Sequence, residues 1–167
     1  MNRLRDNLLN AGLFQLGWLA CVFGAQRPWL LLIAATCLAI HVCVLARPGE
    51  WRGLLAVTLF GCLLDSLLLH LGVFDFADAN LLLPTWLALL WALFASTLRH
   101  SLAWTACPWW LGSLLGALGA PLSYFGGARL AGVELPLGLW PTLMLLGAIW
   151  AGVMPLVHWL AGNVRSR

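Results

Sequence analysis

The chain has 167 residues, of which 62% are hydrophobic and 9% are charged, whereas soluble domains average about 25% charged residues. This composition excludes an ordinary water-soluble protein and predicts a single transmembrane domain over residues 1–167. The formal net charge of +3 comes from basic residues scattered in ones and twos, so the charge pattern predicts no binding to nucleic acid.

Six apolar stretches follow one another along the chain, each close to the roughly 20 residues that a helix needs to cross a bilayer. The predicted spans cover residues 8–25, 28–46, 54–74, 81–98, a stretch from 108 that breaks up at 124–127, and 136–161. The first stretch is interpreted as a retained span, because Asn10 and Gln15 interrupt its apolar core and a cleaved signal peptide has no use for them. The expected fold class is all-α, a polytopic integral membrane protein with a bundle of about six transmembrane helices.

The arginines are divided unevenly between the two sides of this bundle. With the N-terminus in the cytoplasm, seven arginines lie on the cytoplasmic side and two on the other: Arg3, Arg5, Arg47, Arg52, Arg99, Arg165 and Arg167 against Arg27 and Arg129. Cytoplasmic loops of membrane proteins carry the excess of basic residues. The sequence therefore predicts that both termini are cytoplasmic.

The third span carries a carboxylate, Asp65, near its middle. A charged side chain at the centre of a membrane helix costs roughly 2.5–3.5 kcal/mol, so Asp65 is expected to face other helices. Gly61 lies one turn away on the same face, where a small residue lets another helix approach. Counting depth along the spans places Trp18, Trp86, Trp150 and Gly119 within roughly one helical turn of the level of Asp65. The indole N–H groups of the tryptophans are donors that can satisfy the carboxylate.

Asn10 and Gln15 are expected to make hydrogen bonds between helices. The predicted buried polar node therefore consists of Asp65, Gln15, Asn10, Trp18 and Trp86. Two interpretations of this node remain open. It is a structural hydrogen-bonding centre, or Asp65 takes part in binding a proton or a substrate.

The fifth stretch is rich in glycine. Gly112 and Gly116 form a GxxxG pair, and Gly119 and Pro121 follow in the same stretch. This pattern predicts close packing against a neighbouring helix and a kink near Pro121.

The remaining histidines and acidic residues are not predicted to form a site. His41 and His158 fall near span ends, where histidines are usually solvated. A cation site of His70, Asp75 and Asp78 is disfavoured, because loop carboxylates usually keep a turn in water.

No motif indicates catalysis. A nucleophilic pair of Ser113 and His158 is disfavoured, since it lacks a third group and an oxyanion donor. The five cysteines do not have the spacing of a metal site or a disulfide framework. We therefore expect no catalytic residues, no metal site and no cofactor, and the sequence favours a protein that is not an enzyme.

Several groups of residues together resemble a known family. They are Asn10-x3-Phe14-Gln15-x2-Trp18-x2-Cys21, Gly61-x3-Asp65, Pro84-x-Trp86-Leu87-x3-Trp91-x2-Phe94-Ala95-x-Thr97-Leu98 and Gly116-x2-Gly119-x-Pro121-x2-Tyr124-x2-Gly127. The set is similar to domain-of-unknown-function family 2878, a family of small bacterial inner-membrane proteins. The resemblance covers nearly the whole chain and implies a multi-pass protein of the inner (cytoplasmic) membrane. It also implies lipid-modifying partners, because similar members are often encoded beside methyltransferases resembling cyclopropane-fatty-acid synthases and beside flavin-dependent oxidoreductases.

Two classes of function follow from these observations. The first is a non-catalytic membrane partner or scaffold in the lipid bilayer, associated with membrane-bound lipid-modifying enzymes and with lipid modification or protection against membrane stress. The alternative is a small-molecule or proton-coupled binding or transport protein, which a buried carboxylate and glycine-rich helices also fit.

Overall fold

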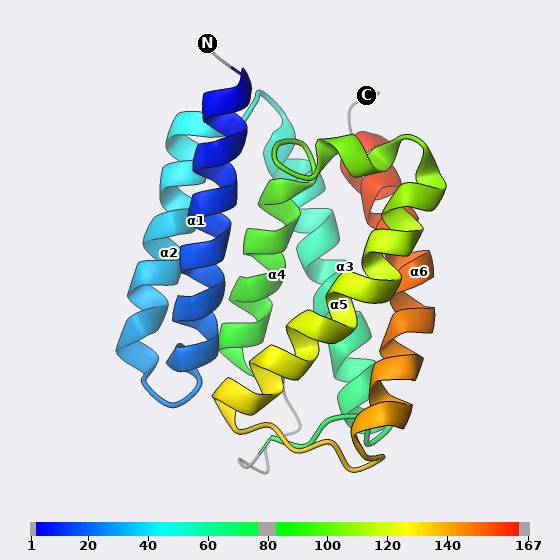
Figure 1. Ribbon diagram of the computed structural model, residues 1–167. Helices are drawn as coiled ribbons and strands as arrows, with labels where there is room; N and C mark the ends of the chain where they lie inside the picture. The colour runs from blue at the N-terminus through cyan, green and yellow to red at the C-terminus, as the bar shows by residue number, and fades with distance from the viewer. Residues whose placement is uncertain (1–2, 77–82, 164–167) are drawn as a thin grey trace.

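The computed structural model describes residues 3–76 and 83–163, which form helices joined by short connections (Figure 1). The described chain has six α-helices: α1 (Arg3–Gly24), α2 (Leu31–Ile40), α3 (Glu50–His70), α4 (Thr85–Thr97), α5 (Trp109–Ala131) and α6 (Leu139–Asn163). Three short helical turns lie between them: η1 (Pro28–Leu30), η2 (His41–Leu45) and η3 (Ala103–Ala106). The predicted all-α class with six helices is confirmed.

Four segments of the described chain are long and apolar enough to cross a membrane: Arg3–Gly24, Pro28–Leu45, Glu50–His70 and Leu139–Gly162. These candidate spans indicate a multi-pass membrane protein. Helix α4 is apolar but has 13 residues, which at 1.5 Å per residue gives roughly 20 Å against a hydrocarbon core of about 30 Å. Helix α5 is not among the candidate spans. Length and composition thus support four of the six predicted crossings.

Consecutive helices run in opposite directions, so α1 begins and α6 ends at the same end of the bundle, here called the terminal end (Figure 1). Helix α1 packs against α2 and α4, α3 packs against α4 and α6, and α5 packs along α6. The connection from α2 to α3 and the segment after α4 also lie at the terminal end (Figure 1). Residues far apart in the sequence, near positions 10, 45 and 100, therefore meet there.

Small residues bring α5 and α6 together. A Cβ atom added at Gly116 would collide with the carbonyl oxygen of Trp150 in α6 and would lie 2.6 Å from Cγ of Met154. From the other helix, a Cβ atom at Gly147 would lie 2.9 Å from the carbonyl oxygen of Ala117. Pro121 has no N–H to donate to that carbonyl group. The proline therefore leaves the Ala117 oxygen available for a close contact with α6.

Two expectations for α5 are wrong. A Cβ atom at Gly119 would have no neighbour within 4 Å, so Gly119 does not belong to the tight contact. Gly112 does face a close neighbour, because its Cβ atom would lie 2.7 Å from the carbonyl oxygen of Thr105. The helix also continues through the buried Pro121 to Ala131 instead of breaking up near residue 124, since packing on α6 outweighs the low helix propensity of proline and glycine.

Gly116→Ala is expected to lower the free energy of unfolding by about 1–2 kcal/mol, because overpacking costs roughly 1–3 kcal/mol and alanine returns up to about 1 kcal/mol of helix propensity. Gly119→Ala is the matched control, since its new methyl group enters open space. Thermal unfolding in detergent measures both. Equal stability of the two variants would show that α5 and α6 are not held at this distance.

Candidate functional site

Asp65 is the polar centre of the helix bundle. Its side chain is 0% exposed, and it accepts two hydrogen bonds from other helices. The indole N–H of Trp91 in α4 donates to Oδ2 over 2.7 Å, and the hydroxyl of Tyr124 in α5 donates to Oδ1 over 2.8 Å. One carboxyl group thus connects α3, α4 and α5.

Gly61 makes the bond between Asp65 and Trp91 possible. A Cβ atom at Gly61 would overlap the ring of Trp91, so the absence of a side chain one turn before Asp65 is what admits the indole. Trp91 then stacks on Trp150 of α6, with ring centroids 5.3 Å apart and planes 12° from parallel. Tyr124 stacks in the same way on Phe74, also at 5.3 Å. These aromatic contacts hold the side chains of Trp91 and Tyr124 in place without a ligand.

The other residues of the predicted node lie elsewhere. The indole of Trp18 donates to Oγ of Ser123 over 3.0 Å, and Trp86 packs edge-on against Phe76 at 6.0 Å. Gln15 is on the exposed face of α1. Asn10 belongs to a separate polar cluster at the terminal end, described below. The expectation that these side chains surround Asp65 is therefore corrected, because depth along a helix does not determine which face a side chain occupies.

A cavity of about 250 Å³ lies beside the Asp65 centre, bounded by α1, α4, α5 and α6. Trp91, Tyr124 and Trp150 form part of its wall, as do Gly119 and the Trp18–Ser123 pair. None of the described residues that line it is charged, and aromatic rings cover much of the surface. The cavity is therefore suited to an apolar ligand.

One donor on this wall is unpaired. The side chain of Trp150 is 7% exposed, and its indole N–H makes no hydrogen bond to the described residues. The Tyr124 oxygen is a weak acceptor for this N–H, outside full hydrogen-bond geometry. Buried polar groups are nearly always paired, so a bound acceptor at this position would stabilise the site.

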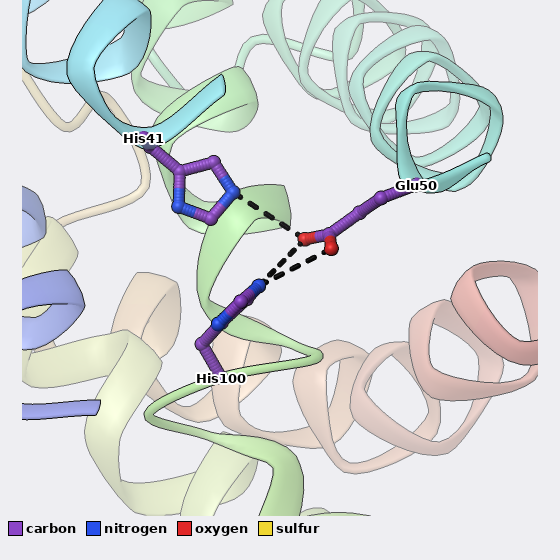
Figure 2. Close-up of side chains that lie close together, drawn as sticks. All are labelled: His41, Glu50 and His100. Carbon is purple, nitrogen blue, oxygen red and sulfur yellow. Dashed lines mark hydrogen bonds and ion pairs between the residues drawn. The ribbon is translucent and has the colours of Figure 1, made fainter. Parts of the chain in front are cut away.

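A second polar cluster, His41, Glu50 and His100, lies at the terminal end (Figure 2). Nε2 of His41 is 3.3 Å from Oε1 of Glu50, and Nε2 of His100 is 3.0 Å from Oε1 and 3.2 Å from Oε2. The three side chains are between 1% and 3% exposed. The expectation that His41 is solvated is wrong, because α1 and α4 cover it.

Irregular backbone brings these three residues together. His41 begins the π-helical turn η2, a kind of turn that is often found at functional sites. Gly49 adopts a left-handed φ of 76°, which favours glycine, and it turns the chain so that Glu50 starts α3. The backbone N–H of Arg47 then donates to Oε2 of Glu50 over 2.9 Å. His100 lies in the turn that follows α4.

Asn10 determines the tautomer of His41. Its Oδ1 accepts from the backbone N–H of Ser101 over 3.2 Å, and its Nδ2 donates to the carbonyl oxygen of Ser96 over 3.2 Å. These two backbone groups set the orientation of the amide. Nδ2 therefore also donates to Nδ1 of His41, at 3.1 Å, and the imidazole proton lies on Nε2, facing Glu50.

The disfavoured alternatives do not form sites among the described residues. His158 bonds Oγ1 of Thr105 at 2.8 Å and is not hydrogen-bonded to Ser113 in the described part of the chain. Nδ1 of His70 bonds the carbonyl oxygen of Ser66. The backbone of Asp75 pairs with Glu134, and Asp78 lies outside the described residues.

These features define the protein as an all-α, multi-pass membrane protein with an apolar cavity and two buried polar centres. The chain belongs to the family described as protein of unknown function DUF2878, whose profile matches residues 7–156. This match confirms the resemblance seen in the sequence. No curated protein and no solved structure matches the chain.

Proposed function

We propose that the protein binds an acyl lipid, or a part of one, in the cavity beside Asp65. The observation that carries this proposal is the cavity itself, which is apolar and lined by aromatic rings. The indole N–H of Trp150, one of the lining residues, is a buried donor without a partner among the described residues, and an acceptor reaches it when neighbouring side chains shift. A ligand that fits such a site has an apolar chain and one hydrogen-bond acceptor, and acyl lipids have both. The volume of about 250 Å³ is near the lower end of ligand pockets, about 300–1,000 Å³.

The surroundings of the cavity support the same proposal. Its lining comes from helices packed in a bundle with four candidate membrane spans. Molecules dissolved in the bilayer are therefore the ligands that surround the protein. Asp65 holds Trp91 and Tyr124 in place on the wall, and a site with fixed walls loses less entropy on binding. In this proposal Asp65 positions the binding site and does not contact the ligand.

We also propose that the bundle lies in a bacterial inner membrane with its terminal end in the cytoplasm. Five described arginines, Arg3, Arg5, Arg47, Arg52 and Arg99, belong to segments at the terminal end, and Arg27 and Arg129 belong to the opposite end. The excess agrees with the distribution of basic residues in membrane proteins.

Gly119→Phe is expected to reduce the occupancy by an acyl ligand at least tenfold, because the new ring fills open space on the cavity wall. Native mass spectrometry of the purified protein with oleic acid measures occupancy. Gly152→Phe is the matched control, since Gly152 also has no neighbour within 4 Å of an added Cβ atom but lies on the exposed side of α6. Trp150→Phe keeps the ring and removes the N–H, so its expected loss is about tenfold.

Equal occupancy in Gly119→Phe and Gly152→Phe would contradict binding in the cavity. Absence of oleic acid and of extracted lipid from the wild-type protein, together with stable co-purification of a lipid-modifying enzyme, would favour the scaffold function instead.

A further inference from the structure

We propose that His41, Glu50 and His100 form a binding site for one divalent transition-metal ion. The Nε2 atoms of the two histidines and a carboxylate oxygen of the glutamate all lie within 4.8 Å of one another. All three side chains point toward a common centre (Figure 2), and each is at least 97% buried. Two imidazoles and one carboxylate are a ligand set for zinc and for iron(II).

The spacing of the donor atoms suits such an ion. Metal–ligand bonds of about 2.0–2.2 Å in a tetrahedral site separate the ligand atoms by roughly 3.3–3.6 Å. The distances from Oε1 of Glu50 to the two Nε2 atoms are 3.0 and 3.3 Å. A small outward movement of the side chains therefore makes room for the ion. Three protein ligands leave one position open, as in catalytic zinc sites.

The way the three ligands are held also favours a site for an ion over a chance contact of polar groups. They come from η2, from the first turn of α3 and from the turn after α4, so no single helix brings them together. The π-helical turn and the left-handed Gly49 both shape the backbone at this point. Single π-helical turns are frequent at functional sites, whereas a left-handed glycine is an ordinary way to turn the chain into a helix.

Asn10 modulates the affinity of this site. A histidine that binds a metal through Nε2 carries its proton on Nδ1 and needs an acceptor there. Asn10 presents its NH₂ group to Nδ1 of His41, so metal binding requires the amide to turn and to give up its bond to Ser96 and its two bonds from Ser101. Three neutral hydrogen bonds correspond to roughly a hundredfold in an equilibrium constant. The zinc-binding constants of protein sites are larger than this hundredfold cost by many orders of magnitude.

The test uses the full chain in detergent, with any polyhistidine tag removed. Cobalt(II) is the probe, because its visible absorption reports coordination by protein ligands, and bound metal per chain is measured by elemental mass spectrometry. We expect one cobalt ion per wild-type chain and displacement of it by zinc. Glu50→Gln and His100→Asn are expected to weaken binding at least a hundredfold. His158→Asn is the control, since it changes another histidine at the terminal end that bonds Thr105 instead.

Asn10→Asp supplies a second measurement in the opposite direction. A carboxylate at position 10 accepts the Nδ1 proton of His41 and keeps the bonds from Ser101, although it loses the bond to the carbonyl oxygen of Ser96. Cobalt is therefore expected to bind about 10–100 times more tightly. A purely structural cluster does not predict this gain. The proposal is overturned if wild type binds no cobalt, or if Glu50→Gln and His158→Asn bind it equally. None of the three ligands lines the cavity, so this result is independent of lipid binding.

Discussion

Replacing Asn10 with leucine is expected to lower the free energy of unfolding by about 2–4 kcal/mol. The amide makes four hydrogen bonds, to Nδ1 of His41, to the carbonyl oxygen of Ser96, and to the N–H and the hydroxyl of Ser101. Each bond contributes about 1 kcal/mol on average, or about 0.6 kcal/mol between helices in a membrane. Leucine makes none of them, and it leaves the backbone groups of α4 and the following turn without partners.

Gln15→Leu is the matched control for this change, because Gln15 carries the other amide of α1 and lies on its exposed face. We expect Gln15→Leu to keep the full free energy of unfolding, since an amide on the exposed face of α1 makes no favourable interaction with a surrounding apolar medium. Unfolding in mixed micelles of detergent and sodium dodecyl sulfate compares the two variants. If both lose the same amount, Asn10 does not hold α1 to α4 in the way the structure describes.

Asp65→Leu is expected to cost about 2–3 kcal/mol of unfolding free energy, whereas Asp65→Asn costs about 1 kcal/mol. Leucine leaves the N–H of Trp91 and the O–H of Tyr124 buried without an acceptor, and a single such group costs about 1–3 kcal/mol. Asparagine presents its oxygen to Trp91 and its NH₂ group to the Tyr124 oxygen, which accepts. Two bonds therefore remain, but the second is reversed and leaves the O–H of Tyr124 without its acceptor, which is the cost of this variant.

The same unfolding assay measures these two variants, with Cys62→Ala as a control on the same helix. Cys62 is half-buried, three residues before Asp65. A stability of Asp65→Leu equal to that of Asp65→Asn would show that the carboxyl group does not pair with the two donors. If Asp65→Asn folds normally but binds no acyl ligand, then Asp65 contributes to binding beyond positioning the wall.

The inward position of Asp65 was predictable from the sequence, but its partner was not. Trp86 is predicted as a partner of Asp65 because the Cα atoms of the two residues lie at a similar depth. Side chains, however, do not extend at right angles from a helix. They tilt toward the N-terminus of their own helix, and α3 and α4 run in opposite directions (Figure 1). The side chains of Asp65 and Trp91 thus tilt toward each other and meet. Gly61 was the available signal, since an empty position one turn before a buried acid admits a large donor.

The cluster of His41, Glu50 and His100 escaped prediction for a different reason. From the sequence, only His41 is considered, as a histidine near a span end that is usually solvated, and Glu50 and His100 are not considered as site residues. Their contact depends on the packing of α1, α2 and α4, which brings residues 9 and 50 positions apart to one point. The sequence nevertheless holds a clue in the topology, because helices that alternate in direction place all three residues at the same end of the bundle.

The separation of Asp65 from its partners affects how the chain enters the membrane. Trp91 and Tyr124 are 26 and 59 residues further along the chain, so α3 is synthesised and inserted before either donor exists. An aspartate at a helix centre opposes insertion by about 2.5–3.5 kcal/mol, while each leucine favours it by roughly 0.3–0.6 kcal/mol. Helix α3 contains eight leucines, and four of them, Leu55, Leu59, Leu63 and Leu67, are exposed on its outer face. The favourable insertion energy of these leucines offsets the cost of inserting Asp65 before it has a partner. Helix α4 is inserted next and supplies the hydrogen bond from Trp91, and α5 follows and supplies the one from Tyr124.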